Sequence, residues 1–400
     1  MNSSPSIRPS PADVRPLRIT LVPGTWAYGF WNRKKTRYIP ANPPRWFEVN
    51  SAFRNKLEEE LRHHDVPFEI AVHEWDGSNS IFRRWEEARR LSHKINAQGQ
   101  RGFRSVVIAH SHGGNIAARA AALLPLDGFE LITLATPFLR AEERSEGSPK
   151  TIMAIVFTVL CFICFGTFQF ASGTTETREI LWNYLLGMLL VVPLVVLRIW
   201  FWKYPNRELS FALNYGAFTR GPLLVIRGFA DEASATIVLG SIGTELMNGF
   251  LYLIATPLRW MWEHKILAFL LPVLGAGLAG AFLFYVTQIF QIISLWGAIA
   301  VLLAALVLPL LAAGAFSSVF GREMFFKSLD FILSVDSVPD SNCNADVVTL
   351  SVTQISLAGM RHGIYSHPGC APLIANWLAT GQAELPYWVT HPSSTKKPRE

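Results

Sequence analysis

A serine at position 111 stands where a short apolar strand turns directly into a helix. The segment Val106–Ala117 reads VVIAHSHGGNIA: a β-branched run, then Ser111 between two histidines, then small residues. A sharp strand-to-helix turn forces its central residue into a strained conformation and lifts the hydroxyl clear of the sheet. Such a turn needs small residues two positions before and after the serine, and Ala109 and Gly113 meet this need. The pattern favours a nucleophilic serine, and an ordinary serine cap of the helix is the alternative.

At this turn the chain resembles the α/β-hydrolase superfamily, and more closely its lipase-like and esterase-like members. In that family one amide of the oxyanion hole belongs to the residue after the nucleophile, which is His112 in this chain. The other comes from the loop after an early strand, which matches Pro-Gly-Thr-Trp-Ala at residues 23–27, with Pro23 where related hydrolases have histidine. The resemblance implies Thr25 or Trp26 as this second donor, and a plain Pro-Gly turn is the alternative.

The resemblance also implies an acid and then a histidine later in the chain than Ser111. The family's acid follows the next-to-last strand, where the sequence LLVIRGFADEAS supplies Asp231, with the adjacent Glu232 as the alternative acid. An ordinary helix cap is the alternative role for Asp231. The family's histidine follows the last strand and stands shortly before a proline that opens the last helix, which matches His362 better than His367. The acid fixes the histidine tautomer, and the histidine acts as the general base.

The polar parts of the chain alternate between strand and helix patterns, which predicts a mostly parallel sheet flanked by helices. Six runs read as strands: Leu17–Val22, Phe68–Trp75, Ser105–Ala109, Phe129–Ala135, Leu223–Arg227 and Val347–Leu357. Two amphipathic runs, Asn50–His63 and Ser80–Ala97, read as helices between the first three strands. The predicted class is therefore α/β, and the resemblance implies the α/β-hydrolase fold. Apolar runs in the chain add inserted transmembrane helical hairpins to this prediction.

Two strongly apolar stretches interrupt this pattern. The chain has 400 residues of which 50% are hydrophobic, which is more than an ordinary soluble protein contains. A helix needs roughly 20 apolar residues to span a bilayer, so four spans are expected, as hairpins at 149–203 and 265–321. Lysine and arginine flank the base of the first hairpin, which predicts a multi-pass membrane protein whose catalytic domain faces the cytoplasm. Leu246–Trp262 is too short to span and reads as an interfacial helix.

The expected organisation is a hydrolase core that the two hairpins interrupt. Its three parts are residues 16–148, 204–264 and 322–390, with a disordered tail at 1–15 and a basic tail at 391–400. Each hairpin crosses the bilayer an even number of times, so the three parts of the core stay on one side.

Other chemistries are disfavoured, and no cofactor or metal is expected. The glycines at 275–280 match a dinucleotide fingerprint, but no strand precedes them and no acidic residue follows. The histidine pairs at 63–64 and at 110 and 112 lack metal-ligand spacing. The net charge is +6, but the basic residues are dispersed, so nucleic acid is not an expected partner. The expected partners are a lipid bilayer and a lipid or other acyl-ester substrate.

The expected function is a membrane-anchored serine hydrolase that cleaves carboxylic esters, lipid esters in particular, through an acyl-enzyme. Transfer of the acyl group to an alcohol and deacylation of lipidated proteins or glycolipids are alternatives on the same triad. A catalytically silent membrane scaffold is the non-enzymatic alternative. A channel or transporter is disfavoured because the expected spans hold almost no ionisable residues.

Overall fold

The computed structural model of the chain divides into two compact units. The first comprises Met1–Ala141, Ser210–Ser241 and Ser334–Glu400, and the second comprises Glu142–Leu209 and Ile242–Leu333. The structure describes residues 15–28, 39, 41–124, 129–143, 206–213, 221–228, 320–325, 331–336, 338–339, 345–350 and 363–384. Most described residues belong to the first unit. In the second unit, Phe320, Glu323 and Met324 are buried around the 3-10 helix η1 (Arg322–Phe325).

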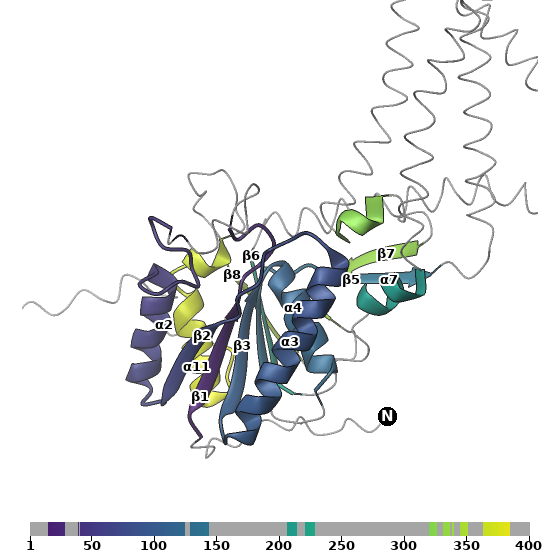
Figure 1. Cartoon of the computed structure of the whole chain (residues 1–400). Helices are drawn as coiled ribbons and strands as arrows, with labels where there is room; N and C mark the ends of the chain where they lie inside the picture. The colour runs from purple at the N-terminus through teal and green to yellow at the C-terminus, as the bar shows by residue number, and fades with distance from the viewer. Residues whose placement is uncertain are drawn as a thin grey trace, which may run out of the picture. The chain divides into compact units, whose positions relative to one another are not determined.

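A six-stranded parallel sheet forms the centre of the first unit (Figure 1). Its strands are β1 (Leu17–Val22), β2 (Phe68–Val72), β3 (Arg104–His110), β4 (Phe129–Leu134), β6 (Leu223–Gly228) and β8 (Ala345–Leu350). Their order is β2-β1-β3-β4-β6-β8, and every neighbouring pair is parallel. The carboxyl ends of all six strands therefore lie at one edge. The predicted α/β class with a mostly parallel sheet is confirmed.

Helices cover both faces of this sheet (Figure 1). One face carries α2 (Ala52–His63) and α11 (Cys370–Thr380), and the other carries α3 (Ile81–Gln100) and α4 (His112–Ala122). Successive side chains of β3 alternate between the two cores. Val106 and Ile108 pack with α2 and α11, whereas Val107 and Ala109 pack with α3 and α4. Burial on both faces explains why this strand is continuously apolar instead of alternating.

The two predicted amphipathic helices begin at capping serines. Ser51 precedes α2 and Ser80 precedes α3, both with extended backbone conformations. The Ser51 hydroxyl accepts a hydrogen bond from Arg54 N–H at 3.3 Å, and the Ser80 hydroxyl accepts one from Arg83 N–H at 3.3 Å. Each cap satisfies a backbone donor that the helix cannot satisfy itself, which stabilises a helix by about 1 kcal/mol.

A buried ion pair ties the sheet together at its amino edge. Glu130 at the start of β4 is 2% exposed and pairs with Arg104 at the start of β3, with a distance of 2.8 Å from Nη2 to Oε2. The same Nη2 also donates to the carbonyl of Leu378 at 3.0 Å. The guanidinium therefore joins two strands to the carboxyl-terminal helix α11.

Several elements were not predicted from the sequence. A two-stranded sheet consists of β5 (Phe138–Glu143) and β7 (Phe331–Asp336), and a short helix, α7, spans Asn206–Leu213. β5 reads FLRAEE, in which the apolar residues are too few to show a period. The last strand of the main sheet, β8, begins two residues before the predicted Val347 start, and residues 351–362 lie outside the described ones.

The expected transmembrane hairpins, and with them the expected multi-pass membrane location, require correction. Within the described ranges, no helix combines the length and the apolar character needed to cross a membrane. The longest described helix, α3, has 20 residues but carries ion pairs such as Arg83 with Glu86 and Arg90 with Glu86, which lipid solvates poorly. Of the hairpin ranges 149–203 and 265–321 the structure describes only residues 320–321, and the expected tails and interfacial helix lie almost wholly outside the described residues.

Candidate active site

Ser111 forms the turn between β3 and α4 in a strained backbone conformation. Its φ is 55° and its ψ is −134°, a region that costs a residue with a side chain about 1–3 kcal/mol. Its N–H donates to the carbonyl of Leu134 at 2.9 Å, which anchors the turn to β4. The Ser111 hydroxyl makes no capping hydrogen bond with α4. Ser111 is therefore not an ordinary helix cap, which was the alternative interpretation of this segment.

Three glycines allow other parts of the chain to approach this turn. A Cβ added to Gly24 would lie only 2.8 Å from the Cβ of Ser111. A Cβ on Gly113 would collide with the main chain at the end of β1, and one on Gly114 would collide with the side chain of Thr136. The requirement for a small residue two positions after Ser111 thus has a direct steric cause. The loops after β1 and β4 both touch the turn.

The turn also lies at a topological switch point of the sheet. The strand order places β2 on one side of β1 and β3 on the other. In open parallel sheets, ligands bind beyond the carboxyl ends of the strands at such a point, because adjacent loops diverge there. The loop after β1 (residues 23–28) and Ser111 after β3 occupy this position.

The loop after β1 distinguishes between the two predicted oxyanion donors. The N–H of Trp26 donates to the carbonyl of Gly77 at 3.0 Å, so this amide is already used. The N–H of Thr25 makes no hydrogen bond with any described residue. His112 is the first residue of α4, where helix amides point outward and favour negative charge. This geometry favours Thr25 over Trp26 as the partner of His112.

Tyr365 brings the carboxyl-terminal segment to the turn at Ser111. Its ring centroid lies 5.1 Å from that of His110, the residue before the serine. The same ring stacks on Trp46 at 5.5 Å with an interplanar angle of 19°. Burial raises the pKa of the Tyr365 hydroxyl above its ordinary value. Tyr365 belongs to the 3-10 helix η3 (Ile364–Ser366), so the chain immediately after His362 packs against the turn.

The candidate acid Asp231 and the candidate base His362 lie outside the described residues. The strands that lead to them end at Gly228 and Leu350, both at the carboxyl edge of the sheet. Ser111 follows β3 at that same edge. The three strands that precede the predicted triad residues in the chain therefore all end at one edge of the sheet.

His367, the alternative histidine, has a structural role in the turn before α11. Its Nδ1 accepts a hydrogen bond from the N–H of Gly369 at 3.0 Å. Its own N–H donates to the carbonyl of Ile364 at 3.0 Å. Because Nδ1 accepts this hydrogen bond, neutral His367 carries its proton on Nε2. Nε2, the nitrogen that takes the proton in a Ser-His-Asp triad, then cannot act as a base, which favours His362.

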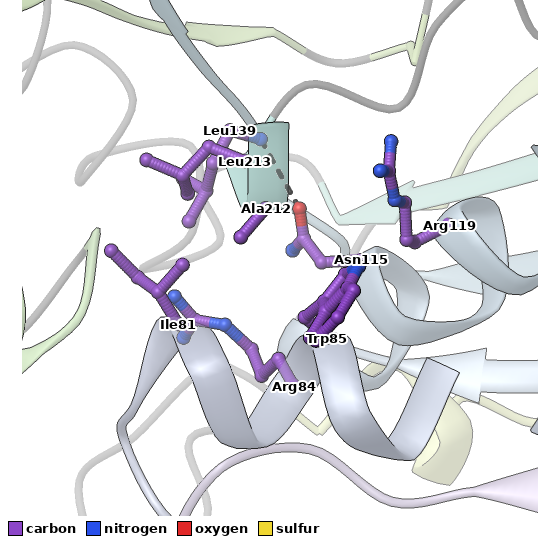
Figure 2. Close-up of a pocket in the computed structure, with 8 residues that line it drawn as sticks. All are labelled: Ile81, Arg84, Trp85, Asn115, Arg119, Leu139, Ala212 and Leu213. Carbon is purple, nitrogen blue, oxygen red and sulfur yellow. Dashed lines mark hydrogen bonds between the residues drawn. The ribbon is translucent and has the colours of Figure 1, made fainter. Parts of the chain in front are cut away.

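Asn115 on α4 closes the loop after β4. Its Oδ1 accepts from Leu139 N–H at 3.2 Å (Figure 2). Its Nδ2 donates to the carbonyl of Pro137 at 2.8 Å. A cavity of about 10 Å³ lies beside Asn115, which is room for about one water molecule and too little for an ester. Its lining residues are Ile81, Arg84, Trp85, Asn115, Arg119, Leu139, Ala212 and Leu213.

Sequence reasoning missed the residues that support the site. Asn115, Trp75 and Gly77 hold the loops around Ser111 through long-range hydrogen bonds, and no local motif signals such contacts. Among the described residues, no three His, Cys, Asp or Glu side chains converge as metal ligands. No protein-family model and no curated protein matches the chain, so the function is inferred from this geometry and from the residues themselves.

Proposed function

We propose that the chain is a serine hydrolase of the α/β-hydrolase type that cleaves carboxylic esters. The observation that carries this proposal is the conformation of Ser111, whose φ of 55° is strained and whose hydroxyl caps nothing. Strained residues persist where the surrounding structure enforces them, and they gather at active sites. A purely structural serine at this turn would gain stability from a relaxed capping conformation, so a catalytically silent scaffold does not account for the strain.

The proposed reaction is acyl transfer through a covalent intermediate. His362 removes the proton of Ser111 as its oxygen attacks the ester carbonyl, and Asp231 orients His362. The N–H groups of His112 and Thr25 donate hydrogen bonds to the oxyanion. The alcohol leaves with the proton from His362, and water attacks the acyl-enzyme by the reverse sequence to release the acid.

The substrate class is carboxylic esters in general. The preference for lipid esters depended on the expected membrane spans, so it is not retained. Competition between water and an added alcohol for the acyl-enzyme distinguishes a hydrolase from an acyltransferase. A hydrolase releases free acid at a rate that added alcohol changes little.

Labelling with a fluorophosphonate tests this function. Only a serine activated by a base and facing an oxyanion hole reacts at a useful rate, so the probe should modify Ser111 in the parent protein. Ser80→Ala is the matched control, because it removes another helix-start hydroxyl and should leave labelling intact. Equal labelling of a Ser111→Ala variant, or no hydrolysis of p-nitrophenyl acetate by the parent, would contradict the proposal.

The two histidines provide a second test. His362→Ala should lower kcat for p-nitrophenyl acetate by about 10³-fold or more, because the general base is lost. His367→Ala should retain most of the rate and lower the free energy of unfolding by about 1 kcal/mol, because the bond to Gly369 is lost. The reverse result would assign the base to His367.

A further inference from the structure

The loop after β2 holds both ends of the loop that carries the candidate oxyanion donor. The Nε1–H of Trp75 donates to the carbonyl of Pro23 at 2.8 Å. Three residues further on, the N–H of Trp26 donates to the carbonyl of Gly77 at 3.0 Å. Trp75 is 1% exposed and packs in the core with α3 and α4, so its indole is a fixed support. Residues 23–26 are therefore bound at each end to the loop after β2.

The bond to Pro23 sets the orientation of the peptide that precedes the donor. In a trans peptide the carbonyl and the following N–H point in opposite directions, so fixing the Pro23 carbonyl also fixes the rotation of the Gly24 amide. Gly24 lies against Ser111, where even a Cβ would not fit. A small rotation of this peptide therefore moves Thr25, the next residue, relative to the nucleophile.

Thr25 lies between the two supports. Its N–H makes no hydrogen bond with a described residue, and its Oγ1 is a buried hydroxyl atom without a hydrogen-bond partner among them. Buried polar groups ordinarily find partners, and a donor kept without one suits a site where negative charge appears only during the reaction. The supports hold the main chain on each side and leave Thr25 itself unbonded.

We propose that Trp75 is a positioning residue for catalysis: its indole N–H orients the Pro23–Gly24 peptide so that the N–H of Thr25 faces the oxyanion formed at Ser111. This inference rests on the proposed function. Oxyanion donors act because they are held in place before the charge develops, so a loss of orientation lowers the rate without weakening ground-state binding.

Trp85 provides a matched control. Its indole Nε1 is also buried, but it has no hydrogen-bond partner among the described residues. Its ring packs against Phe211 at 6.3 Å and lies under the guanidinium of Arg89 at 5.3 Å, so it too has a packing role. Removing the N–H at Trp85 therefore repeats the chemical change at Trp75 without breaking a bond to the loop.

The experiment replaces Trp75 in one variant and Trp85 in another by β-(3-benzothienyl)alanine. This residue keeps the bicyclic ring and has sulfur in place of the N–H. This substitution keeps the core volume, which Trp75→Ala would not. At Trp75 it should lower kcat for p-nitrophenyl acetate by about 10- to 100-fold and leave KM within about twofold. Amide hydrogen exchange at Trp26 should become about tenfold faster, because the loop opens more often. The Trp85 variant should match the parent in both measurements.

The outcomes separate this inference from the function on which it rests. If the Trp75 variant keeps the parent's kcat, whether or not exchange at Trp26 becomes faster, the positioning role is overturned and the proposed hydrolase function stands. An equal loss of kcat in the Trp85 variant would also overturn the role, because it would show a general effect of the ring exchange. A parent protein that fails to hydrolyse esters and fails to react with fluorophosphonate would overturn the proposed function and the positioning role together.

Discussion

Two helices of the first unit begin at serines that are used in opposite ways. Ser80, before α3, has an extended backbone with φ −136° and ψ 129°, and its hydroxyl accepts a hydrogen bond from Arg83 N–H. Ser111, before α4, has φ 55° and ψ −134° and makes no capping bond. Ser80 thus stabilises its helix. Ser111 instead has a strained backbone, and its hydroxyl makes no hydrogen bond with its helix. The difference shows that residue type and position alone do not determine the role of a serine at a helix start.

The surroundings of the two serines explain how the strain at one of them is maintained. Ser111 is enclosed by the loops after β1 and β4, and its N–H is bound to Leu134. Gly24 meets its Cβ closely enough that no larger residue fits. Ser51, the cap of α2, repeats the pattern of Ser80. Ser51 and Ser80 are both relaxed caps, and Ser111 departs from both.

The largest expected difference between the two serines is catalytic. Ser111→Ala should reduce kcat for p-nitrophenyl acetate by about 10⁴-fold or more, because the nucleophile is lost. Ser80→Ala should keep kcat within about twofold of the parent. Steady-state ester hydrolysis measures both values. Comparable losses in the two variants would remove the functional distinction between the serines.

A second difference concerns how closely the main chain approaches each site. Gly24→Ala should lower kcat by about 100-fold, because its Cβ would lie 2.8 Å from that of Ser111 and displace the loop or the nucleophile. Gly102→Ala is the control: its φ of 80° makes alanine costly, but no atom lies within 4 Å of the added Cβ. Gly102→Ala should therefore lower the free energy of unfolding by about 1 kcal/mol and leave kcat unchanged. An unchanged kcat in Gly24→Ala would show that the loop can move away from Ser111 without any loss of activity.

Ser80 and Ser111 should also differ in how much each contributes to the free energy of unfolding. Ser80→Ala should lower the free energy of unfolding by about 1 kcal/mol, because α3 loses its capping bond. Ser111→Ala should change it by less than about 0.5 kcal/mol, because no cap is lost. Urea unfolding monitored by circular dichroism measures both. A larger loss at Ser111 than at Ser80 would mean that the Ser111 hydroxyl has a structural role.

The smallest expected effect isolates the strain itself. Ser111→Gly and Ser111→Ala both lack the hydroxyl, so their stability difference reports the backbone. Glycine should make the protein about 0.5–1 kcal/mol more stable than alanine here, since it adopts positive φ freely but has more freedom in the unfolded chain. The midpoints of urea unfolding give this difference in the free energy of unfolding, provided that both variants have the same m-value. Equal stability would show that the turn at Ser111 holds little strain.

Local patterns in the sequence were sufficient for much of the fold. The strand Leu17–Val22 was predicted with its observed bounds, and the helices at Ala52–His63 and Ile81–Gln100 were predicted within a few residues. These elements depend on apolar periodicity and on caps, which are properties of neighbouring residues. The expectation of membrane-spanning hairpins came from hydropathy alone and required correction. In the part of the chain that the structure describes, no helix is both long enough and apolar enough to cross a bilayer.

The sequence by itself determined the position of Ser111, because a buried strand, a tight turn and a helix of small residues are adjacent in the chain. Only the tertiary structure decided what surrounds it. The bond from Trp75 to Pro23 joins residues 52 positions apart, and the contact of Tyr365 with His110 joins segments that are far apart in the sequence. The choice of Thr25 over Trp26 likewise depends on one hydrogen bond from a neighbouring loop. Such contacts follow from the order of the strands, which brings distant segments to one edge of the sheet and which no local pattern encodes.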